Sequence, residues 1–341
     1  MYFCQKFLSM NSLFQNFQDA TVLVVGDVMI DCYLSGKVNR ISPEAPVPIL
    51  EVAQREHRLG GAANVALNLQ SLGAKPILCT VIGDDAKGNT FYSLADENRF
   101  DKTGIVVERG RRTTIKYRII GNNTQMLRVD DEDIYDIKQD TADTLYNRIR
   151  RIIDAQKIDA IIFEDYDKGL LNKDIIQRIV QLAQSKHIIT TVDPKKKNFN
   201  HYQGATFFKP NLKELSEGLN IFDAKKALEN IQTLMQDYST THQIKYIMTT
   251  LSENGIAICD SNKAQFYQQP AFMRSINDVS GAGDTVISIA TLCLIQQLPI
   301  EDIALLSNLG GGLVCEHLGV VPISAEMLYD EYVKRSNKHN I

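Results

Sequence analysis

Cysteine pairs and long apolar runs are both missing from this sequence. The six cysteines stand at positions 4, 32, 79, 259, 293 and 315, without a C-x-x-C pair, and most of them lie in apolar runs. Such a distribution is typical of reduced, buried thiols, so we expect neither disulfides nor a zinc site. No run reaches the roughly 18 apolar residues that a membrane-spanning helix needs, and residues 1–20 lack the basic segment and cleavage site of a signal peptide. We therefore expect a cytoplasmic protein with no membrane partner.

Strong charge of either sign is also missing. The formal net charge is −4 over 341 residues, and the longest basic run is Lys195-Lys196-Lys197. A nucleic-acid-binding surface is therefore not expected, and the predicted partner is a small molecule. With 44% hydrophobic residues, the chain can bury a large core.

Two common glycine-rich motifs that bind nucleotides are absent as well. The sequence has no Walker A motif, and the first predicted strand, 21–25, is followed by Gly26-Asp27-Val28 rather than by G-x-G-x-x-G. These absences argue against a P-loop ATPase and against a dinucleotide dehydrogenase.

The chain does contain a regular alternation of short β-branched runs and amphipathic segments. Strands are predicted at 21–25, 76–81, 160–163, 188–192, 206–209, 246–250 and 255–259, and helices at 62–72, 137–153, 174–185 and 223–237. The alternation predicts an α/β fold with a doubly wound, mainly parallel sheet flanked by helices. Ligands bind such sheets at the carboxyl ends of the strands.

Two segments, about 32–56 and about 105–130, break this alternation. The first contains three prolines between short strand-like pieces, and the second contains a hairpin pattern over 113–129 with a polar turn at 121–123. We expect the two segments to form a small β-sheet lid over the strand ends, which would keep water from a reacting group. Residues 1–330 are then one domain, opening with an amphipathic lead-in helix in 1–20, and 331–341 are a C-terminal tail.

The most informative stretch lies near the end of the chain. Asn277–Thr285, with the residues N-D-V-S-G-A-G-D-T, runs directly into a long apolar series. It reads as a tight turn that opens a buried helix, where the free backbone N–H groups of Gly281, Ala282 and Gly283 form an anion site. Asp284 stands beside this site, and a carboxylate there suits a base that removes a proton from an attacking hydroxyl group. For a lone G-x-G, a packing turn without chemistry is the more common explanation.

Two further clusters lower the weight of that explanation. Gly60-Gly61-Ala62-Ala63-Asn64 opens another helix, and Asn211-Leu212-Lys213-Glu214 follows a predicted strand. The three motifs, G-G-x-x-x-N, N-x-x-E and D-x-x-G-A-G-D in this order, resemble the ribokinase-like sugar kinases, the PfkB carbohydrate kinase family. Spacing alone also allows Asn211 and Glu214 to form a helix capping box, and both roles can hold at once.

The resemblance implies a site for ATP and Mg²⁺. Asp284 is the expected base, with the Gly281–Gly283 amides as the anion hole, and Glu214 is expected to hold Mg²⁺ through water. The expected nucleotide-binding residues are Asn211, Leu212, Lys213, Glu214, Thr250, Ser252, Gly255 and Asn308. The expected sugar-binding residues are Asp27, Asp31, Gly60, Gly61 and Asn64. For Asp27, a turn-stabilising role is equally compatible with the spacing.

Longer segments carry a closer resemblance. Residues 26–31, 38–48, 59–66, 165–169 and 250–255 are similar to the D-glycero-β-D-manno-heptose 7-phosphate kinases of lipopolysaccharide core synthesis. This similarity implies transfer of the ATP γ-phosphoryl group to O1 of the heptose 7-phosphate in ADP-heptose synthesis. The candidate cations for the substrate's own phosphate are Lys116, Arg118, Arg128 and Lys168. Asp167 departs from the glycine that is usual in these kinases.

The resemblance also bears on partners and alternatives. No H-x-G-H nucleotidyltransferase motif occurs, so we expect the product to pass to a separate phosphatase and nucleotidyltransferase. An exposed lid edge favours a homodimer through the lid. Another sugar or nucleoside kinase of the same fold, resembling a ribokinase or fructokinase, is one alternative. A sugar-binding regulator without turnover is the other.

Overall fold

A computed structural model of the chain describes residues 14–221, 223–272, 274–317 and 319–339. Its centre is a nine-stranded sheet with the order β13-β12-β11-β10-β9-β8-β1-β4-β5. The strands are β1 (Thr21–Gly26), β4 (Lys75–Gly83), β5 (Ile105–Glu108), β8 (Ala160–Glu164), β9 (Ile189–Asp193), β10 (Phe207–Phe208), β11 (Tyr246–Thr250), β12 (Ile256–Asp260) and β13 (Gln265–Gln269). The pairs β11–β12 and β12–β13 are antiparallel, and the other neighbouring strands of this sheet are parallel. The predicted mainly parallel sheet is confirmed.

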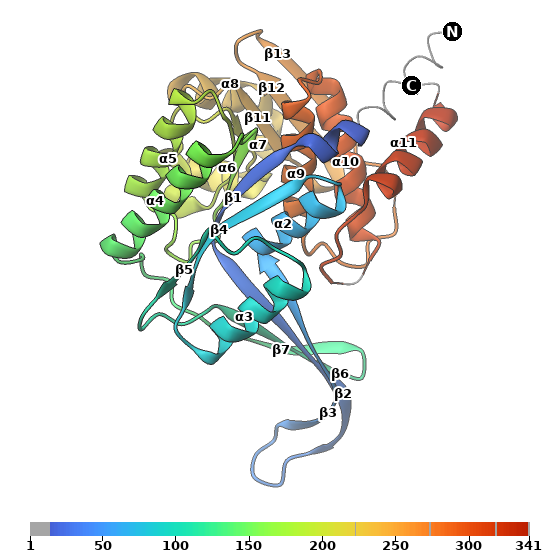
Figure 1. The fold of residues 1–341 in the computed structure, drawn as a ribbon. Coiled ribbons are helices and arrows are strands. Elements are labelled where there is room, and N and C mark those ends of the chain that lie inside the picture. Colours follow the sequence, from blue (N-terminus) through green and yellow to red (C-terminus); the bar gives the residue numbers. More distant parts are fainter. Residues whose placement is uncertain (1–13, 222, 273, 318, 340–341) are drawn as a thin grey trace.

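The central strands are apolar on both faces because helices cover both faces (Figure 1). In β1, Val22 and Val24 belong to one buried cluster and Leu23 and Val25 to the other. The first cluster includes residues of α2 (Ala62–Ser71), α3 (Ala86–Glu97), α9 (Ala282–Ile295), α10 (Ile300–Cys315) and α11 (Ala325–His339). The second includes residues of α4 (Gln139–Ala155), α5 (Lys173–Ser185), α6 (Leu212–Gly218) and α8 (Ile231–His242). Among the described residues, no helix is both long and apolar enough to cross a bilayer.

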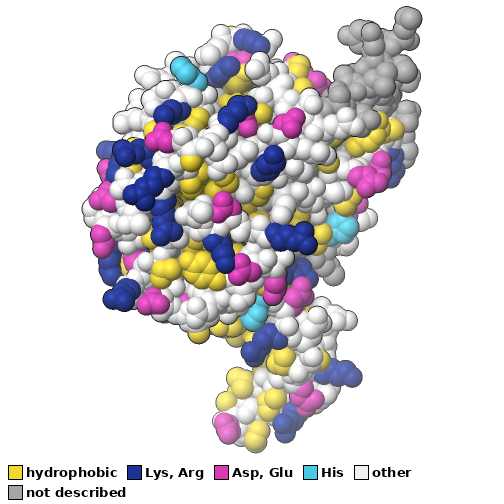
Figure 2. Space-filling view, in the orientation of Figure 1, with side chains coloured by type: hydrophobic (Ala, Val, Ile, Leu, Met, Phe, Trp, Pro, Cys, Tyr) yellow, Lys and Arg dark blue, Asp and Glu magenta, His cyan; other side chains and the backbone are white. Residues whose placement is uncertain are grey.

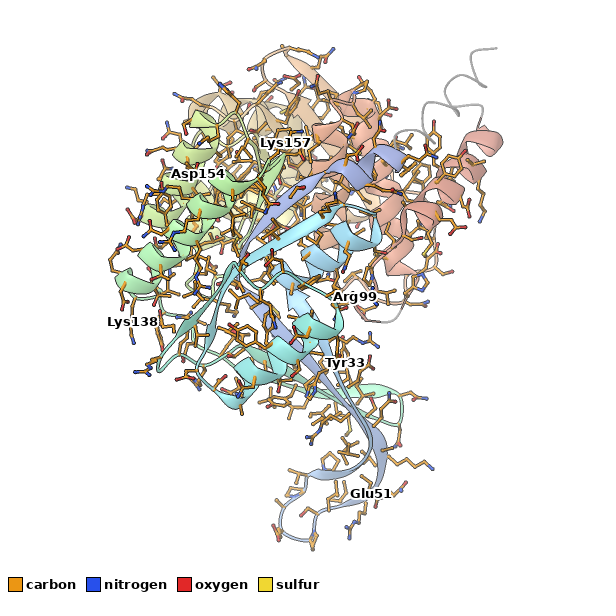
Figure 3. The ribbon with its side chains drawn as sticks, in the orientation of Figure 1. Tyr33, Glu51, Arg99, Lys138, Asp154 and Lys157 are labelled. Atoms are coloured by element: carbon orange, nitrogen blue, oxygen red, sulfur yellow. The ribbon has the colours of Figure 1, made fainter. Side chains whose placement is uncertain are left out.

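A second sheet projects from this body and forms the lid (Figure 1). Its order is β3-β2-β6-β7, from β2 (Val28–Ile41), β3 (Pro48–Gly61), β6 (Ile115–Gly121) and β7 (Thr124–Asp131). The long hairpin β2–β3 pairs from Val28–Gly61 at its root to Ile41–Pro48 at its tip. Figure 3 shows Tyr33 close to the body and Glu51 well out along the projection. The root of the lid is therefore continuous in backbone with the strand ends of the body.

Some predicted boundaries were wrong. Residues 105–108 form β5, an edge strand of the main sheet, so they do not belong to the lid. The predicted helix at 223–237 is two helices, α7 (Ala224–Glu229) and α8, because Asn230 ends the first. The tail predicted for 331–341 is helical through His339, with Glu331 and Tyr332 buried; 340–341 lie outside the described residues. The lead-in helix predicted in residues 1–20 lies mostly outside them as well.

Candidate active site

The candidate site lies where β1, β8 and β9 end and α9 begins. Gly281 precedes α9 with a φ of 79°, in the left-handed region that glycine adopts without strain. A Cβ atom on Gly281 would also lie 3.1 Å from the Asn64 side-chain nitrogen. Glycine at 281 therefore allows this turn, in which the Ala282 N–H donates to the Val279 carbonyl oxygen at 3.3 Å.

Asp284 lies in the first turn of α9 and is only 5% exposed. Asn64 Nδ2 donates to Asp284 Oδ2 at 2.6 Å, and the Tyr166 hydroxyl donates to Oδ1 at 3.0 Å. Burial is the main cause that raises the Asp284 pKa to about 6, and the nearby Asp193 carboxylate acts in the same direction. The two hydrogen bonds oppose this rise. A carboxylate fixed in direction, with a pKa close to neutral, is suited to accept a proton.

Two other buried carboxylates lie beside Asp284. Oxygens of Glu164, Asp193 and Asp284 all lie within 4.8 Å of one another. Glu164 and Asp193 are the last residues of β8 and β9, which are neighbours in the sheet. Lys209 Nζ, 3% exposed, lies 2.8 Å from Asp193 Oδ2. Our sequence reasoning did not assign Glu164, Asp193 or Lys209 to the site, although each ends or follows a predicted strand.

The first turn of α2 supplies the partner of Asp284. Asn64 is buried and reaches Asp284 across a sequence separation of 220 residues. Gly61 caps α2 with a φ of 61°, and a Cβ there would lie 2.4 Å from the Asp27 carbonyl oxygen. A Cβ on Gly60 would lie 2.6 Å from Asp31 Oδ2. The glycines therefore let α2 start close against the residues after β1.

The contacts of Asp27 fit the turn-stabilising role. Its carboxylate accepts hydrogen bonds from the backbone N–H groups of Tyr166, Lys168 and Leu170, each at 3.1 Å. Asp27 thus fixes the loop after β8 that carries Tyr166. Asp31 is different, because its Oδ1 accepts from two guanidinium nitrogens of Arg118, at 2.8 and 3.1 Å.

The N-x-x-E cluster forms the start of α6. Asn211 Oδ1 accepts from the Glu214 N–H at 2.8 Å, and Glu214 Oε2 accepts from the Asn211 N–H at 2.9 Å. The capping box is confirmed. The other Glu214 oxygen pairs with Lys195. Leu212 and Lys213 are the first two residues of this helix.

The remaining predicted nucleotide residues lie near the end of β11 and on α10. Thr250 forms a β-bridge with Asn211, which places the end of β11 beside the N-x-x-E cluster. Ser252 and Gly255 belong to the tight turn between β11 and β12, and Gly255 has a φ of 86°. Asn308, on α10, donates to the Pro270 carbonyl at 2.7 Å, so its amide nitrogen is engaged.

The predicted phosphate-binding cations are all paired with carboxylates. Lys116 lies 3.5 Å from Asp130, and Lys168 lies 2.5 Å from Glu132. Arg128 pairs with Asp130 at 3.0 Å, and Arg118 with Asp31. An anion that enters the lid must therefore compete with these carboxylates.

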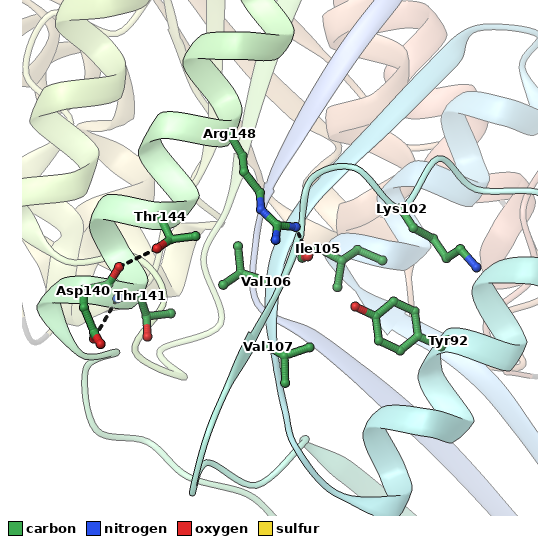
Figure 4. Close-up of a pocket in the computed structure, with 9 residues that line it drawn as sticks. All are labelled: Tyr92, Lys102, Ile105, Val106, Val107, Asp140, Thr141, Thr144 and Arg148. Atoms are coloured by element: carbon green, nitrogen blue, oxygen red, sulfur yellow. Dashed lines mark hydrogen bonds between the residues drawn. The ribbon is translucent and has the colours of Figure 1, made fainter.

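A cavity of about 390 Å³ lies elsewhere, at the β5 edge of the main sheet (Figure 4). Tyr92 and Lys102 line one side of it, and Arg148 of α4 the other. Arg148 donates to the Thr103 carbonyl at 3.3 Å, and so it covers part of this edge. None of the residues around Asp284 lines the cavity, so it is separate from the candidate site.

Comparisons with known proteins identify a family and curated relatives of this chain. The profile of the family described as pfkB family carbohydrate kinase matches residues 19–326. The bifunctional protein HldE of Helicobacter pylori (strain HPAG1) is 39% identical over 305 residues, which cover 89% of this chain and 65% of that protein. HldE of Aliarcobacter butzleri (strain RM4018) is 37% identical over 94% of this chain and 65% of that protein. The chain thus spans about two thirds of the length of these curated relatives.

Solved structures show the same fold. Phosphofructokinase-2 of Escherichia coli, in complex with potassium, aligns with a TM-score of 0.75 at 17% identity over 93% of this chain and 99% of that one. Ribokinase of Arabidopsis thaliana, complexed with ribose and ATP, aligns with a TM-score of 0.69 at 14% identity over 92% and 98%. The ribokinase-like fold is thereby confirmed, and with the match over residues 19–326 the chain belongs to the pfkB family of carbohydrate kinases.

Proposed function

We propose that this protein transfers the γ-phosphoryl group of ATP to O1 of D-glycero-β-D-manno-heptose 7-phosphate, a step of ADP-heptose synthesis. The observation that carries the proposal is the buried Asp284 carboxylate, held between Asn64 and Tyr166 at the start of α9. The choice of sugar rests on the resemblance of residues 26–31, 38–48 and 59–66 to the heptose 7-phosphate kinases.

Asp284 is the proposed base. The sugar hydroxyl loses its proton to an Asp284 oxygen as its own oxygen attacks the γ-phosphorus, and the bond to the β–γ bridging oxygen breaks so that ADP leaves. The N–H groups of the Gly281–Gly283 turn stabilise negative charge on the transferring group, and the Ala282 N–H exchanges the Val279 carbonyl for it. The Asn64 and Tyr166 hydrogen bonds fix the orientation of the Asp284 carboxylate, which lowers the entropic cost of reaching the reactive geometry.

Magnesium fits the carboxyl-rich surroundings of this site, because hard cations prefer oxygen donors. Both carboxylate oxygens of Glu214 already have partners, Lys195 and the Asn211 N–H. Glu214 therefore suits a contact to Mg²⁺ through water rather than direct ligation. When bound with ATP, the ion offsets phosphate charge.

The lid is the proposed site for the far phosphate of the substrate. Lys116, Arg118 and Lys168 lie on the lid or the adjoining loop, and their side chains are 13%, 18% and 16% exposed. A phosphate would replace Asp130 as the partner of Lys116, Asp31 as the partner of Arg118, or Glu132 as the partner of Lys168. Charge-assisted hydrogen bonds of this kind are strong and select for a phosphorylated sugar.

The lid also supports association between copies. Its strands and hairpin tip expose large apolar side chains, namely Ile41, Val47, Val52, Met126, Leu127 and Val129. In the view of Figure 2, hydrophobic side chains lie on the projecting lid among Lys, Arg, Asp and Glu side chains. An exposed apolar sheet is typical of an interface, so a homodimer through the lid is part of this proposal.

The test is an ADP-release assay with heptose 7-phosphate, unphosphorylated heptose, ribose and fructose as acceptors. We expect turnover only with the phosphorylated heptose. Equal turnover with an unphosphorylated sugar would replace the proposal by a ribokinase-like or fructokinase-like activity. No turnover with any sugar, together with tight sugar binding, would favour a non-catalytic regulator.

A further inference from the structure

Lys195 lies between the N-x-x-E cluster and the surroundings of Asp284, and the mechanism above assigns it no step. It follows Asp193, the last residue of β9, by two positions. Its ammonium group pairs with Glu214. The same nitrogen lies 5.6 Å from the centre of the Tyr166 ring, whose hydroxyl group donates to Asp284. One tyrosine ring therefore separates the Lys195 ammonium from the proposed base.

The strand end that carries Lys195 also lies against the Gly281–Gly283 turn. A Cβ atom on Gly283 would lie 3.5 Å from Asp193 Oδ2 and 3.6 Å from Lys209 Nζ. A phosphoryl group held by the amides of this turn would therefore lie beside the end of β9, next to the segment that carries Lys195. Burial opposes the charge of Lys195, but nearby carboxylates outweigh it and hold its pKa above the usual value.

Two neighbouring lysines are less suited to contact that group. Lys209 is only 3% exposed, and its Nζ lies 2.8 Å from Asp193. Lys213, in the first turn of α6, has a side chain that is 83% exposed and lies 3.8 Å from Glu217, further along the same helix. The Lys195 side chain is 33% exposed, so a ligand can reach it while its ion pair holds it in place.

The proposed reaction needs a cation besides Mg²⁺. Phosphoryl transfer spreads negative charge over the oxygens of the transferring group, and a lysine commonly acts there together with the metal ion. This chain has no Walker A motif, so it has no P-loop lysine. Mg·ATP is still an anion, and oxygens of Glu164, Asp193 and Asp284 lie within 4.8 Å of one another beside the turn. An ammonium group has three donors, so Lys195 can keep Glu214 and still donate to a phosphate oxygen.

We propose that Lys195 is a further catalytic residue, whose ammonium group donates to an oxygen of the ATP γ-phosphoryl group during its transfer. This inference rests on the proposed kinase function. The ion pair with Glu214 is kept, so Lys195 connects the N-x-x-E cluster to the reacting phosphate. A charge-assisted donor fixed in this way stabilises the negative charge of the transferring group.

The first test compares two nucleotides by titration calorimetry on the full chain. The β,γ-imido analogue of ATP has a γ-phosphoryl group and ADP has none, and both are measured with Mg²⁺. We expect Lys195→Met to weaken binding of the analogue at least about tenfold and binding of ADP less than about threefold. Lys195→Arg keeps the charge and should lose less. Lys196→Met, at the exposed neighbouring position, is the matched control and should change neither affinity.

The outcomes separate this inference from the proposed function. Equal losses for both nucleotides in Lys195→Met, or no loss for the analogue, would overturn the contact and leave the kinase function in place. A selective loss in Lys213→Met but not in Lys195→Met would assign the contact to Lys213 instead. A wild type that binds neither nucleotide and phosphorylates no sugar would overturn the kinase function and this inference with it.

A double-mutant cycle distinguishes a direct contact from an effect through Glu214. Glu214→Gln removes the charge that Lys195 pairs with and leaves the lysine in place. For a direct contact, Lys195→Met should lower the ratio of analogue to ADP affinity about as much in the Glu214→Gln background as in the wild type. If the loss disappears in that background, Lys195 only positions Glu214, and the proposed contact with the γ-phosphoryl group is wrong.

Discussion

The two sides of the candidate site are built by different means. On the body side, Asn64, Glu164, Asp193 and Asp284 are all at most 5% exposed, and strand ends and helix starts fix them. On the lid side, Lys116, Arg118 and Lys168 keep between 13% and 18% exposure and pair with carboxylates within 3.5 Å. Buried groups shift their pKa values, whereas part-exposed pairs exchange partners easily. We therefore propose that the chemistry belongs to the body side and the choice of substrate to the lid side.

Asp284→Asn is the substitution with the largest expected effect, and it tests whether the body side carries the chemistry. Loss of the base should lower turnover at least about a hundredfold while nucleotide and sugar still bind. Asparagine keeps the size of the side chain and removes the buried charge, so the fold should persist. Single-turnover kinetics and binding assays on one preparation would measure this. Near-normal turnover would remove the base assignment and place the chemistry elsewhere.

Arg118→Ala tests the lid side. It removes a guanidinium that we expect to contact the substrate phosphate, which corresponds to about 10–100-fold in the KM for the phosphorylated sugar. The KM for ATP should change little, and steady-state kinetics with each substrate varied in turn would show the difference. Arg128→Ala, at a half-exposed lid position, is a matched control with a smaller expected change. Equal effects of Arg118→Ala on both KM values would contradict the division between the two sides.

The pH profile sharpens the assignment of Asp284. Its pKa is raised to about 6, and the base must be ionised to accept a proton. Turnover should therefore fall as the pH drops below about 6, approaching tenfold for each further pH unit. Tyr166→Phe removes a hydrogen bond that favours the ionised form of Asp284, so the fall in turnover should move to higher pH. If Tyr166→Phe leaves the pH at which turnover falls unchanged, the fall must come from the titration of another group.

The smallest effect is expected at the lid surface. Leu127 is 57% exposed, so Leu127→Glu should change the free energy of unfolding by no more than about 0.5 kcal/mol. The same change places charges in the proposed interface and should weaken the dimer, which light scattering would detect. The exposed Ile134, at 64% and outside the lid strands, gives the control Ile134→Glu. A monomeric wild type would overturn the dimer proposal at once.

The sequence predicted the outline of the body better than its chemistry. Glycine turns followed by apolar helices are local patterns, so the starts of α2 and α9 and the capping box of Asn211 and Glu214 could be recognised directly. Glu164, Asp193 and Lys209 carry no such pattern, because each is a polar residue at the end of a short apolar run. Only the sheet order, with β8 beside β9 and α9 above them, brings these three side chains to Asp284.

The sequence predicted that a lid exists, but not its boundaries or its ion pairs. Prolines and a hairpin pattern marked the two segments, yet residues 105–108 joined the main sheet, because their apolar run pairs with β4 just as well. Which carboxylate meets which lysine depends on strand register and side-chain direction, and neither is visible in composition. For Asp27, spacing could not show that three backbone donors converge on its carboxylate, a contact that fits the turn-stabilising role.

The continuity of the β2–β3 hairpin has a mechanical consequence. Each strand has 14 residues, which corresponds to about 45 Å of extended chain. Asp31 and Gly60 lie at one end of this arm, and Glu51 lies well along it. A rotation of a few degrees at the Asp31–Gly60 end would thus displace the far end by several ångströms. Spin labels near Glu51 would therefore report, as a change in distance to the body, a lid movement that accompanies sugar binding near Asp31 and Gly60.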